Sequence, residues 1–311
     1  MARGAMSMSD FAIFSPAYVY VDGRLDQFLR DGVGRAVAEL QPPLRAALVL
    51  YVMLYGFAII RGAISEPIMD FAVRSIKLVI IYRLATTVAY DDYVTQPLFH
   101  LFPDTVAKAI SGTSISDPGA AFDQFLNRVA FLADKIADKA TLSDLSPWIM
   151  SGAVAIVGAL AAALGFGVVL VTKVALAFIV CLGPFFVACS LFEATRRYFF
   201  GWLSQAVNYI ILFGMVIAIF QLVLSLVDAQ WDSITGLDPM SAGLLFISLC
   251  ILGAIFFLQT PAMAAGIAGG ASMGLADFGY AAASAFRGPS VRNPPGPRLV
   301  DSGGSIRPTG R

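Results

Sequence analysis

Long apolar runs recur along this chain, and their length predicts helices that cross a membrane. Residues 44–60, 206–227 and 241–260 hold at most one charged side chain each. A helix needs about 20 mostly apolar residues to cross the hydrocarbon of a bilayer. The pattern therefore predicts an all-α, polytopic helical membrane protein with about five transmembrane helices, a broken or re-entrant segment, and amphipathic helices outside the membrane.

A different pattern precedes the first run. Over residues 24–41 apolar positions recur at helical spacing and charged residues fill the rest, which predicts an amphipathic helix. Pro42 and Pro43 are expected to end this helix. The apolar stretch 11–21 contains Pro16, and we expect it to be a surface strand or an interfacial segment and not a signal peptide.

Residues 44–90 are expected to hold the first two membrane spans, the second of them over 71–90. Arg74, Lys77 and Arg83 interrupt the second span. Arg74 and Lys77 can reach the water from one end of the helix. Arg83 is deeper, where a charge costs about 3 kcal/mol. We therefore expect Arg83 to be an intramembrane charge that faces protein or water.

Residues 91–147 form a polar block, which predicts a small domain outside the membrane. The block contains eight Asp and four Lys or Arg residues. Within it a helix is expected, because apolar residues recur at helical spacing. These residues are Phe122, Phe125, Leu126, Val129, Leu132 and Ile136.

The longest apolar stretch runs from 148 to 192, 45 residues interrupted only by Lys173. As one helix it would measure about 67 Å, twice the thickness of the membrane core. We therefore expect a helix break in the membrane at Gly183 and Pro184, with Lys173 as a second intramembrane charge. Two spans are the simplest interpretation. One span plus a broken or re-entrant half-helix agrees better with the charges on either side.

Those charges also suggest an orientation. Asp228, Asp232 and Asp238 follow one span without a basic residue, whereas Arg196 and Arg197 precede that span and arginines fill the tail. Basic residues concentrate in cytoplasmic loops. We therefore expect a multi-pass protein with its N-terminus in the periplasm and its C-terminus in the cytoplasm. The expected divisions are a periplasmic N-terminal segment (1–43), two spans (44–90), a periplasmic domain (91–147), a membrane core (148–280) and a disordered basic tail (281–311).

Between the apolar runs around 183 and 209 lie a charged cluster and an aromatic stretch, an arrangement typical of a membrane–water interface. Glu193 and Arg197 have the i, i+4 spacing of a pair on one helix face. Trp202 is one of three tryptophans near span ends, with Trp148 and Trp231, which predicts an interfacial belt. We expect a cytoplasmic interface cluster that is either an anchor or a docking site for a partner: Glu193, Arg196, Arg197 and Trp202.

Gly266, Gly270 and Gly274 recur every four residues after Pro261. Such a face lets membrane helices approach closely. A phosphate-binding loop is the weaker interpretation, because no Lys-Ser/Thr follows and no strand precedes. We interpret these glycines as a contact between subunits of a homo-oligomer.

Composition narrows the chemistry. The chain is 58% hydrophobic and 14% charged, where a soluble protein has about 25% charged residues. The net charge is zero, so no overall positive field attracts nucleic acid. The three cysteines lie in apolar runs and His100 is the only histidine. Without a nucleophile–base pair or a ligand cluster, we expect no catalytic, cofactor-binding or metal-binding residues, and no enzyme.

Four features appear in a characteristic order: GPFF at 183–186, E-x-x-R-R-Y from Glu193, G-W-L-x-x-x-x-N-Y through Tyr209, and Pro-Ala…Gly-Gly at 261–270. In this order the chain resembles the TrbL family, the polytopic inner-membrane subunit of bacterial type IV secretion and conjugal-transfer systems. The resemblance covers about residues 147–280, and the N-terminal half matches in layout only.

The resemblance implies an inner-membrane scaffold and channel component that supports pilus or stalk assembly and the passage of DNA or protein substrate. The partners that it implies are further copies of the chain in a pentamer, minor pilin and stalk subunits, major pilin, other inner-membrane secretion subunits and their ATPases, and the translocated DNA or protein. The alternative is a secondary transporter of a small solute, with Arg83, Lys173 and the Gly183-Pro184 break forming a site at mid-membrane. The lack of an internal repeat and of intramembrane acids disfavours this alternative.

Overall fold

The computed structural model describes residues 12–62, 68–86, 89–112, 117–141 and 144–286, with side chains except at 68–74, 230–235 and 269–286. The elements in these ranges are all helical. They are α1 (Phe14–Ile60), α2 (Ile68–Thr86), two π-helical turns η1 (Asp91–Thr95) and η2 (Pro97–Leu101), α3 (Phe102–Ser111), α4 (Pro118–Ala137), α5 (Ser146–Cys189), α6 (Arg196–Gly236) and α7 (Pro239–Phe286).

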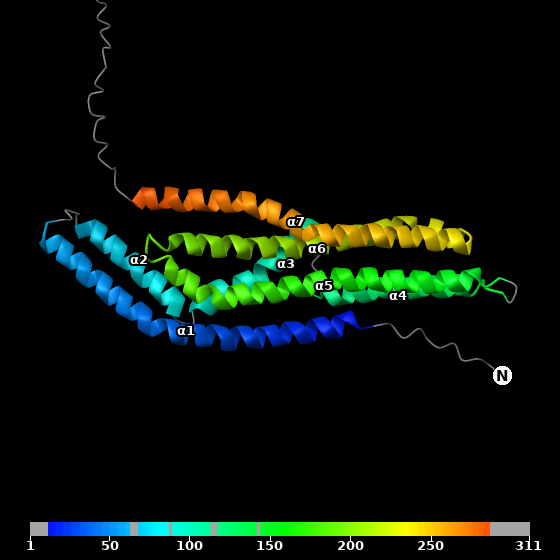
Figure 1. Ribbon diagram of the computed structural model, residues 1–311, viewed down its shortest axis with the longest axis horizontal. Coiled ribbons are helices and arrows are strands. Elements are labelled where there is room, and N and C mark those ends of the chain that lie inside the picture. Colours follow the sequence, from blue (N-terminus) through cyan, green and yellow to red (C-terminus); the bar gives the residue numbers. More distant parts are fainter. Residues whose placement is uncertain (1–11, 63–67, 87–88, 113–116, 142–143, 287–311) are drawn as a thin grey trace, which may run out of the picture.

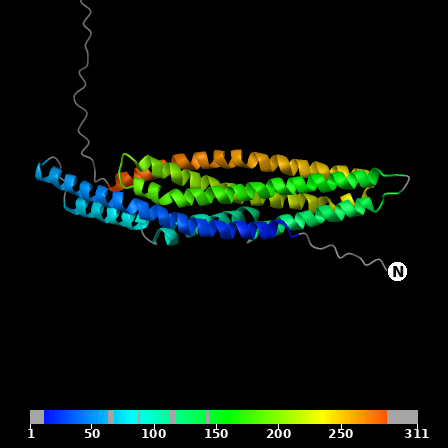
Figure 2. The same ribbon diagram turned by 60° about the horizontal axis from the view of Figure 1, so that its bottom comes forward.

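The long helices run side by side in an elongated bundle. In Figure 1, α7, α6, α5 and α1 follow one another from top to bottom, with α4 beside the first half of α5. Figure 2 shows α2 returning alongside the second half of α1. Because short connections reverse the chain after α5 and α6, these neighbours are antiparallel.

Among the described residues, four helices are long and apolar enough to cross a membrane, namely α1, α5, α6 and α7. This confirms the expected all-α, polytopic membrane fold. The expected second span corresponds to α2, which has 19 residues and is not among the four. Asp70, Arg74, Lys77 and Arg83 lower its apolar character.

Two helix ends differ from the sequence-based expectation. α1 starts at Phe14, inside the stretch expected to be a strand or an interfacial segment, and continues through Pro42 and Pro43. Instead of ending there, α1 bends (Figure 1). The two prolines deprive the carbonyls of Ala38 and Glu39 of their donors, and both of these residues are exposed, so water can reach those carbonyls. At the other end, α7 extends to Phe286, into the expected tail, and 287–311 lie outside the described residues.

The expected domain at 91–147 does not form a separate core. α4 packs along α5, and α3 packs along α6. Phe122, Phe125 and Val129 share one apolar cluster with Phe166, Phe220 and other residues of the long helices. A Cβ on Gly158 of α5 would lie 2.5 Å from the Val129 side chain, so α4 and α5 touch closely. The location of this stretch on the periplasmic side stays a prediction.

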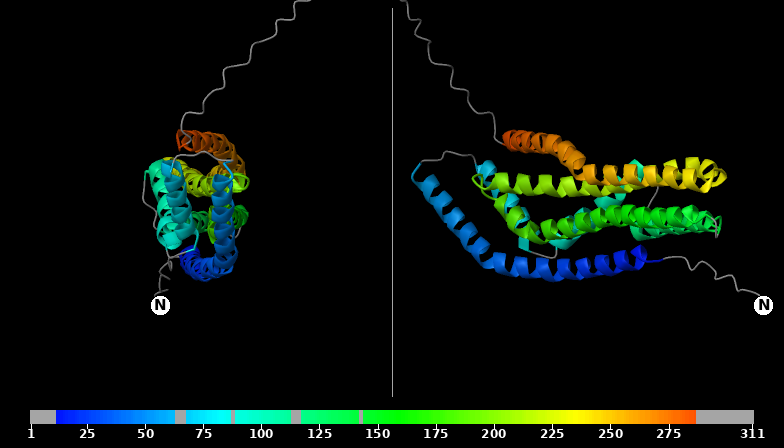
Figure 3. Two further views of the ribbon diagram at one scale, coloured as in Figure 1. Left: turned by 90° about the vertical axis from the view of Figure 1, so that its left-hand side faces the viewer. Right: turned by 45° about the vertical axis from the view of Figure 1, so that its right-hand side comes forward.

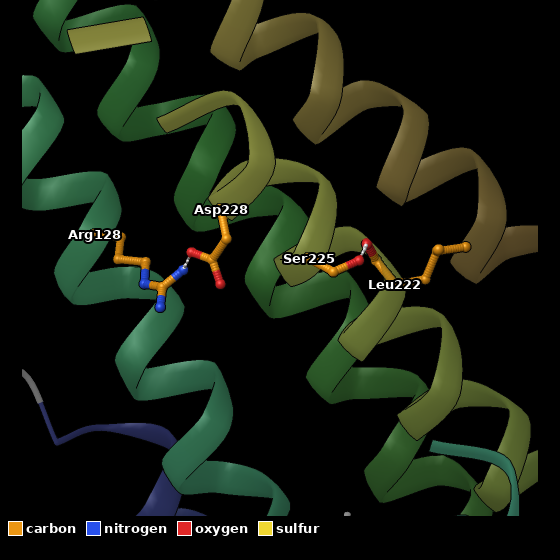
Figure 4. A network of polar contacts seen from close by, with 4 residues as sticks. All are labelled: Arg128, Leu222, Ser225 and Asp228. Atoms are coloured by element: carbon orange, nitrogen blue, oxygen red, sulfur yellow. Dashed lines mark hydrogen bonds and ion pairs between the residues drawn. The ribbon is translucent and has the colours of Figure 1, made fainter. Parts of the chain in front are cut away.

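α4 also holds α6 through an exposed ion pair. Arg128 donates to the carboxylate of Asp228, and Figure 4 shows the two side chains reaching toward each other from α4 and α6. One turn away, Ser225 donates to the carbonyl of Leu222 within α6. The pair puts Arg128 and Asp228 on the same side of any membrane that α6 crosses.

A buried carboxylate of α4 caps α1. Asp123 Oδ1 accepts the backbone N–H groups of Ile13 and Phe14 at 2.9 and 2.8 Å, and Oδ2 accepts that of Ser15 at 2.9 Å. The first N–H groups of a helix have no partner within it, and a negative charge is favoured there. α1 supplies no side-chain cap of its own, so the packing of α4 fixes where α1 begins.

Replacing Asp123 with Ala should therefore destabilise the protein. Three N–H groups lose a charged acceptor at a buried position, which we expect to lower the free energy of unfolding by about 2 kcal/mol. Asp123→Asn keeps one acceptor oxygen and should lose less. Thermal melting in detergent measures this, with Asp134→Ala, an exposed change on the same helix, as the control. Equal melting temperatures for the Asp123 and Asp134 variants would contradict the capping role.

Candidate functional site

α5 does not end at Gly183 and Pro184 but passes through them to Cys189. The expected break takes the form of a bend toward the C-terminal end of α5, which Figure 3 shows. Proline has no N–H, so Pro184 cannot donate to the carbonyl of Val180, four residues earlier. An apolar helix therefore acquires an unsatisfied acceptor at this point.

Two aromatic side chains from other elements satisfy the backbone at the bend. Tyr90 Oη donates to the carbonyl of Val180 at 2.7 Å. Trp202 Nε1, from α6, donates to the neighbouring carbonyl of Ile179 at 2.8 Å. Tyr90 is fully buried and Trp202 is 6% exposed, so water does not compete for these carbonyls. The bend is thus held by a chain of contacts from α6 to α5 and to the start of η1.

Gly183 makes room for this arrangement. A Cβ at Gly183 would lie 1.6 Å from Tyr90 Oη and 2.9 Å from Trp202 Cζ2. No larger residue fits while both aromatic rings stay in place. The two residues of the Gly-Pro pair thus have different effects. Pro184 leaves the Val180 carbonyl without a helical donor, and Gly183 leaves space for the Tyr90 hydroxyl that donates to it.

Trp202, expected in an interfacial belt, has a buried ring that stacks with Phe186, and its depth in the membrane stays a prediction. Trp148, by contrast, is 66% exposed at the start of α5, and the Trp231 side chain lies outside the described part. Tyr90 was not singled out from the sequence. The signal that could have found it is the proline, since a buried Pro184 demands a donor from elsewhere.

The charged cluster lies in the connection between α5 and α6. α6 begins at Arg196, so Glu193 precedes the helix and does not share a helical face with Arg197. Arg197 instead donates to the hydroxyl of Tyr198 at 3.0 Å and lies over its ring. Glu193 and Arg197 are exposed. The structure therefore presents this cluster at one end of the bundle, beside the bend.

The two expected intramembrane charges lie in different surroundings. Lys173 is 4% exposed, and its Nζ lies 3.4 Å from Asp22 Oδ1 of α1. The Nζ also lies 4.7 Å from the ring centroid of Phe99 and 5.3 Å from that of Phe213, distances at which a cation is attracted to a ring. Arg83, on α2, is exposed. Asp22 was missed from the sequence because its stretch was not expected to be helical.

The glycine face is open in the single chain. Gly266 is exposed, and nothing lies within 4 Å of the position that its Cβ would take. Gly270 and Gly274 belong to α7, but their surroundings lie outside the described part. Within the described residues, no three His, Cys, Asp or Glu side chains are grouped as a metal site requires.

Comparison with known proteins gives consistent matches. A family described as TrbL/VirB6 plasmid conjugal transfer protein matches residues 48–260. The type IV secretion system protein VirB6 of Bartonella henselae (strain ATCC 49882 / DSM 28221 / CCUG 30454 / Houston 1) is 28% identical over 275 residues, 85% of this chain and 82% of that protein. The VirB6 protein of Bartonella quintana (strain Toulouse) is 26% identical over 273 residues, with the same coverage. An uncharacterized protein of Rickettsia prowazekii (strain Madrid E) is 24% identical over 245 residues, 67% of this chain and 26% of that protein.

Substituting Gly183 with Ala should displace Tyr90 and weaken the bend. We expect a loss of about 2 kcal/mol, as for other overpacked cores, and about 1 kcal/mol for Tyr90→Phe, which leaves the Val180 carbonyl unsatisfied. The double variant should lose less unfolding free energy than the two single variants added together, because the hydroxyl that clashes with the new methyl group is gone. Thermal melting of the four proteins measures the coupling. Gly167→Ala, at a glycine of α5 with no neighbour within 4 Å, is the control. Strict additivity would contradict the contact.

Proposed function

Because the chain belongs to the TrbL/VirB6 family and is thus a multi-pass inner-membrane component of a type IV secretion system, we propose that it is a scaffold and channel component of that system. In this role it supports assembly of the pilus or stalk and the passage of DNA or protein substrate. The proposed role is structural and involves no enzymatic step.

The contrast between two sides of the bundle carries this proposal. α7 has no charged residue from Ser241 to Ile267, and it exposes large apolar side chains such as Leu244, Ile255 and Leu258. On the other side, the first half of α1 exposes Arg24, Arg30, Asp31, Arg35 and Glu39. The end of α4 exposes Asp134 and Lys135, and the turn after it exposes Lys139. We call these eight residues the charged side.

The charged side runs along α5, because α4 packs on its first half and α1 on its second half (Figure 1). Charged side chains do not face lipid hydrocarbon without a large cost. An apolar side toward lipid and a charged side toward water or another subunit is the arrangement that a ring around an aqueous lumen needs. This supports a channel in which the charged side lines the path of the substrate.

The proposed partners follow from membership in the secretion system. They are other copies of this chain in a pentamer, the minor pilin and stalk subunits, the major pilin, and the other inner-membrane subunits with their ATPases. We place the exposed Glu193 and Arg197 on the cytoplasmic side, as a docking site for those subunits. The Arg128–Asp228 pair supports the proposed orientation, since the charge pattern assigns both residues to the periplasmic side.

A secondary transporter remains the second candidate, because Lys173 and Asp22 form an ion pair inside an apolar bundle. However, Arg83 is exposed on α2 and the Gly183-Pro184 bend is filled by Tyr90 and Trp202, so the proposed transport site has no described cavity at its centre. Solute uptake by the purified protein in liposomes distinguishes the two functions.

The channel proposal predicts a pattern of cysteine labelling in a variant without native cysteines. In spheroplasts, an impermeant maleimide should label Arg30→Cys, Lys135→Cys and Ser114→Cys, but neither Leu258→Cys, which faces lipid, nor Ser204→Cys, which faces the cytoplasm. A bulky maleimide at Arg30→Cys should stop substrate transfer, whereas the same reagent at Ser114→Cys should not. Normal transfer after complete labelling at Arg30→Cys would exclude the charged side as the substrate path, and labelling of Ser204→Cys would reverse the orientation.

The glycine face predicts the oligomer. A Cβ at Gly266 has room within one subunit, so Gly266→Leu should insert and fold, yet separate the subunits by overpacking a contact between helices. Gly270→Leu is expected to separate the subunits in the same way. Native mass spectrometry should show loss of the oligomer, and transfer should fall while membrane abundance is maintained. Gly152→Leu, at an exposed α5 position with no neighbour within 4 Å, should change neither. An unchanged oligomer with normal transfer would place the subunit interface elsewhere.

A further inference from the structure

The exposed surface of α1 changes character at the bend near Pro42 (Figure 1). Up to Glu39 this surface carries charges. After Arg45 the chain has no charged residue until Arg61. The exposed side chains of the second half are instead large and apolar, and they include Val49, Leu50, Val52, Met53, Leu54 and Phe57. Charged side chains avoid hydrocarbon, and a continuous apolar face avoids water. The bend therefore marks the point at which we expect α1 to enter a membrane.

A groove of about 770 Å³ begins at this bend and follows the second half of α1. Gln41 and Arg45 line its polar end, and both are exposed. The rest of the groove is lined by the apolar side chains of Ala46, Val49, Leu50 and Met53. Leu44 and Tyr55 of the same helix half are buried in the bundle. The groove therefore lies on the outer face of α1, where lipid can reach it.

The polar end of the groove suits an anion. Arg45 is the one charged residue among the described residues that line the groove, and no described carboxylate pairs with it. The sequence holds no acidic residue between Glu39 and Glu66. A guanidinium group can donate two parallel hydrogen bonds to a phosphate. Gln41 precedes Arg45 by one helical turn, so its amide can donate to the same group.

The apolar part of the groove suits a hydrocarbon chain. From Arg45 to Met53 the helix rises about 12 Å, and the hydrocarbon of one leaflet is about 15 Å deep. A lipid whose phosphate lies at Arg45 can therefore lay most of one acyl chain against the groove. A free phosphate ion would leave the apolar part uncovered, and an uncharged lipid would leave Arg45 without a partner.

We propose that this groove binds one anionic phospholipid, with its phosphate on Arg45 and Gln41 and one acyl chain along Ala46, Val49, Leu50 and Met53. The lipid fills the outer face of α1 at the bend, where the charged first half meets the apolar second half. The proposal requires only that the chain lies in a membrane, so it holds whether or not the channel proposal is right.

The other arginine of this stretch provides a contrast. Arg61, at the end of α1, is exposed, and its guanidinium lies 4.6 Å from the centroid of the Phe57 ring. Arg61 is not among the residues that line the groove. A general attraction between basic side chains and an anionic membrane would involve both arginines equally, whereas the proposed site involves Arg45 alone.

The test is native mass spectrometry of the purified full-length protein in detergent, with phosphatidylglycerol and phosphatidylethanolamine of identical acyl chains as probes. We expect each subunit to retain one phosphatidylglycerol, bound about fivefold more tightly than phosphatidylethanolamine. Arg45→Gln should abolish this preference, and Arg45→Lys should keep most of it. Arg61→Gln should bind as the parent does. No preference in the parent, or equal losses in Arg45→Gln and Arg61→Gln, would overturn the proposal.

A second pair of variants tests the acyl chain. Leu50→Trp fills the groove without changing its charge and should weaken the binding of both lipids. Val52→Trp, at an exposed position of α1 that does not line the groove, should not. Because both positions are exposed, both variants should melt with the parent in lipid-free detergent, which separates lost binding from lost folding. Unchanged lipid binding by a folded Leu50→Trp variant contradicts the acyl-chain site.

Two other occupants give different results. Glycerol phosphate, which has no acyl chains, should not displace phosphatidylglycerol, and full displacement would indicate a site for phosphate alone. In membranes, a bismaleimide should not join Met53→Cys to another copy or to another secretion subunit. Efficient cross-linking at this position would show that protein covers the groove. Either result overturns the proposal.

Discussion

A backbone carbonyl without a donor is the constraint on which much of this structure depends. Pro184 leaves the Val180 carbonyl without its helical partner. The carbonyl lies among buried side chains, so water cannot take the place of that partner. Tyr90, from before η1, donates to this carbonyl, and Trp202 of α6 donates to the neighbouring carbonyl of Ile179. These two donors bring together three segments that are distant in sequence, namely the start of η1, the bend of α5 and the first turns of α6.

α5 also determines how the rest of the bundle divides. Along one side it is covered in turn by α4 and α1, whose outer faces carry charges, and along the other by α6 and α7. Because Asp123 of α4 caps the first turn of α1, these two covering helices are joined end to end. One side of the bundle is therefore charged because two shorter helical segments, α4 and the first half of α1, pack along the long apolar helix α5. This arrangement supports the proposed channel role.

The sequence predicts the class of fold well, but it predicts few of the contacts between the helices. Unbroken apolar runs such as 206–227 and 241–260 suffice to identify α6 and α7, since length and composition decide whether a helix can span a membrane. The bend at Gly183-Pro184 is also visible in the sequence, but its partner is not, because Tyr90 lies 90 residues from Val180. The partners of Asp22 and Asp123 are likewise distant in sequence. In each case the partner comes from another helix.

The wrong prediction that the helix ends at Pro42 has a physical cause, which involves the same bend in α5. A single straight α1 would move away from α5 where α5 turns at Pro184. α1 instead bends as well, and its second half stays with the end of α5, where Tyr51 meets Phe192 at 6.1 Å between ring centroids. Figure 1 shows the two bent segments tilting in the same direction. The prolines of α1 and α5 therefore act together. Each would be expected to end its helix, but because both helices bend, they change direction without losing contact.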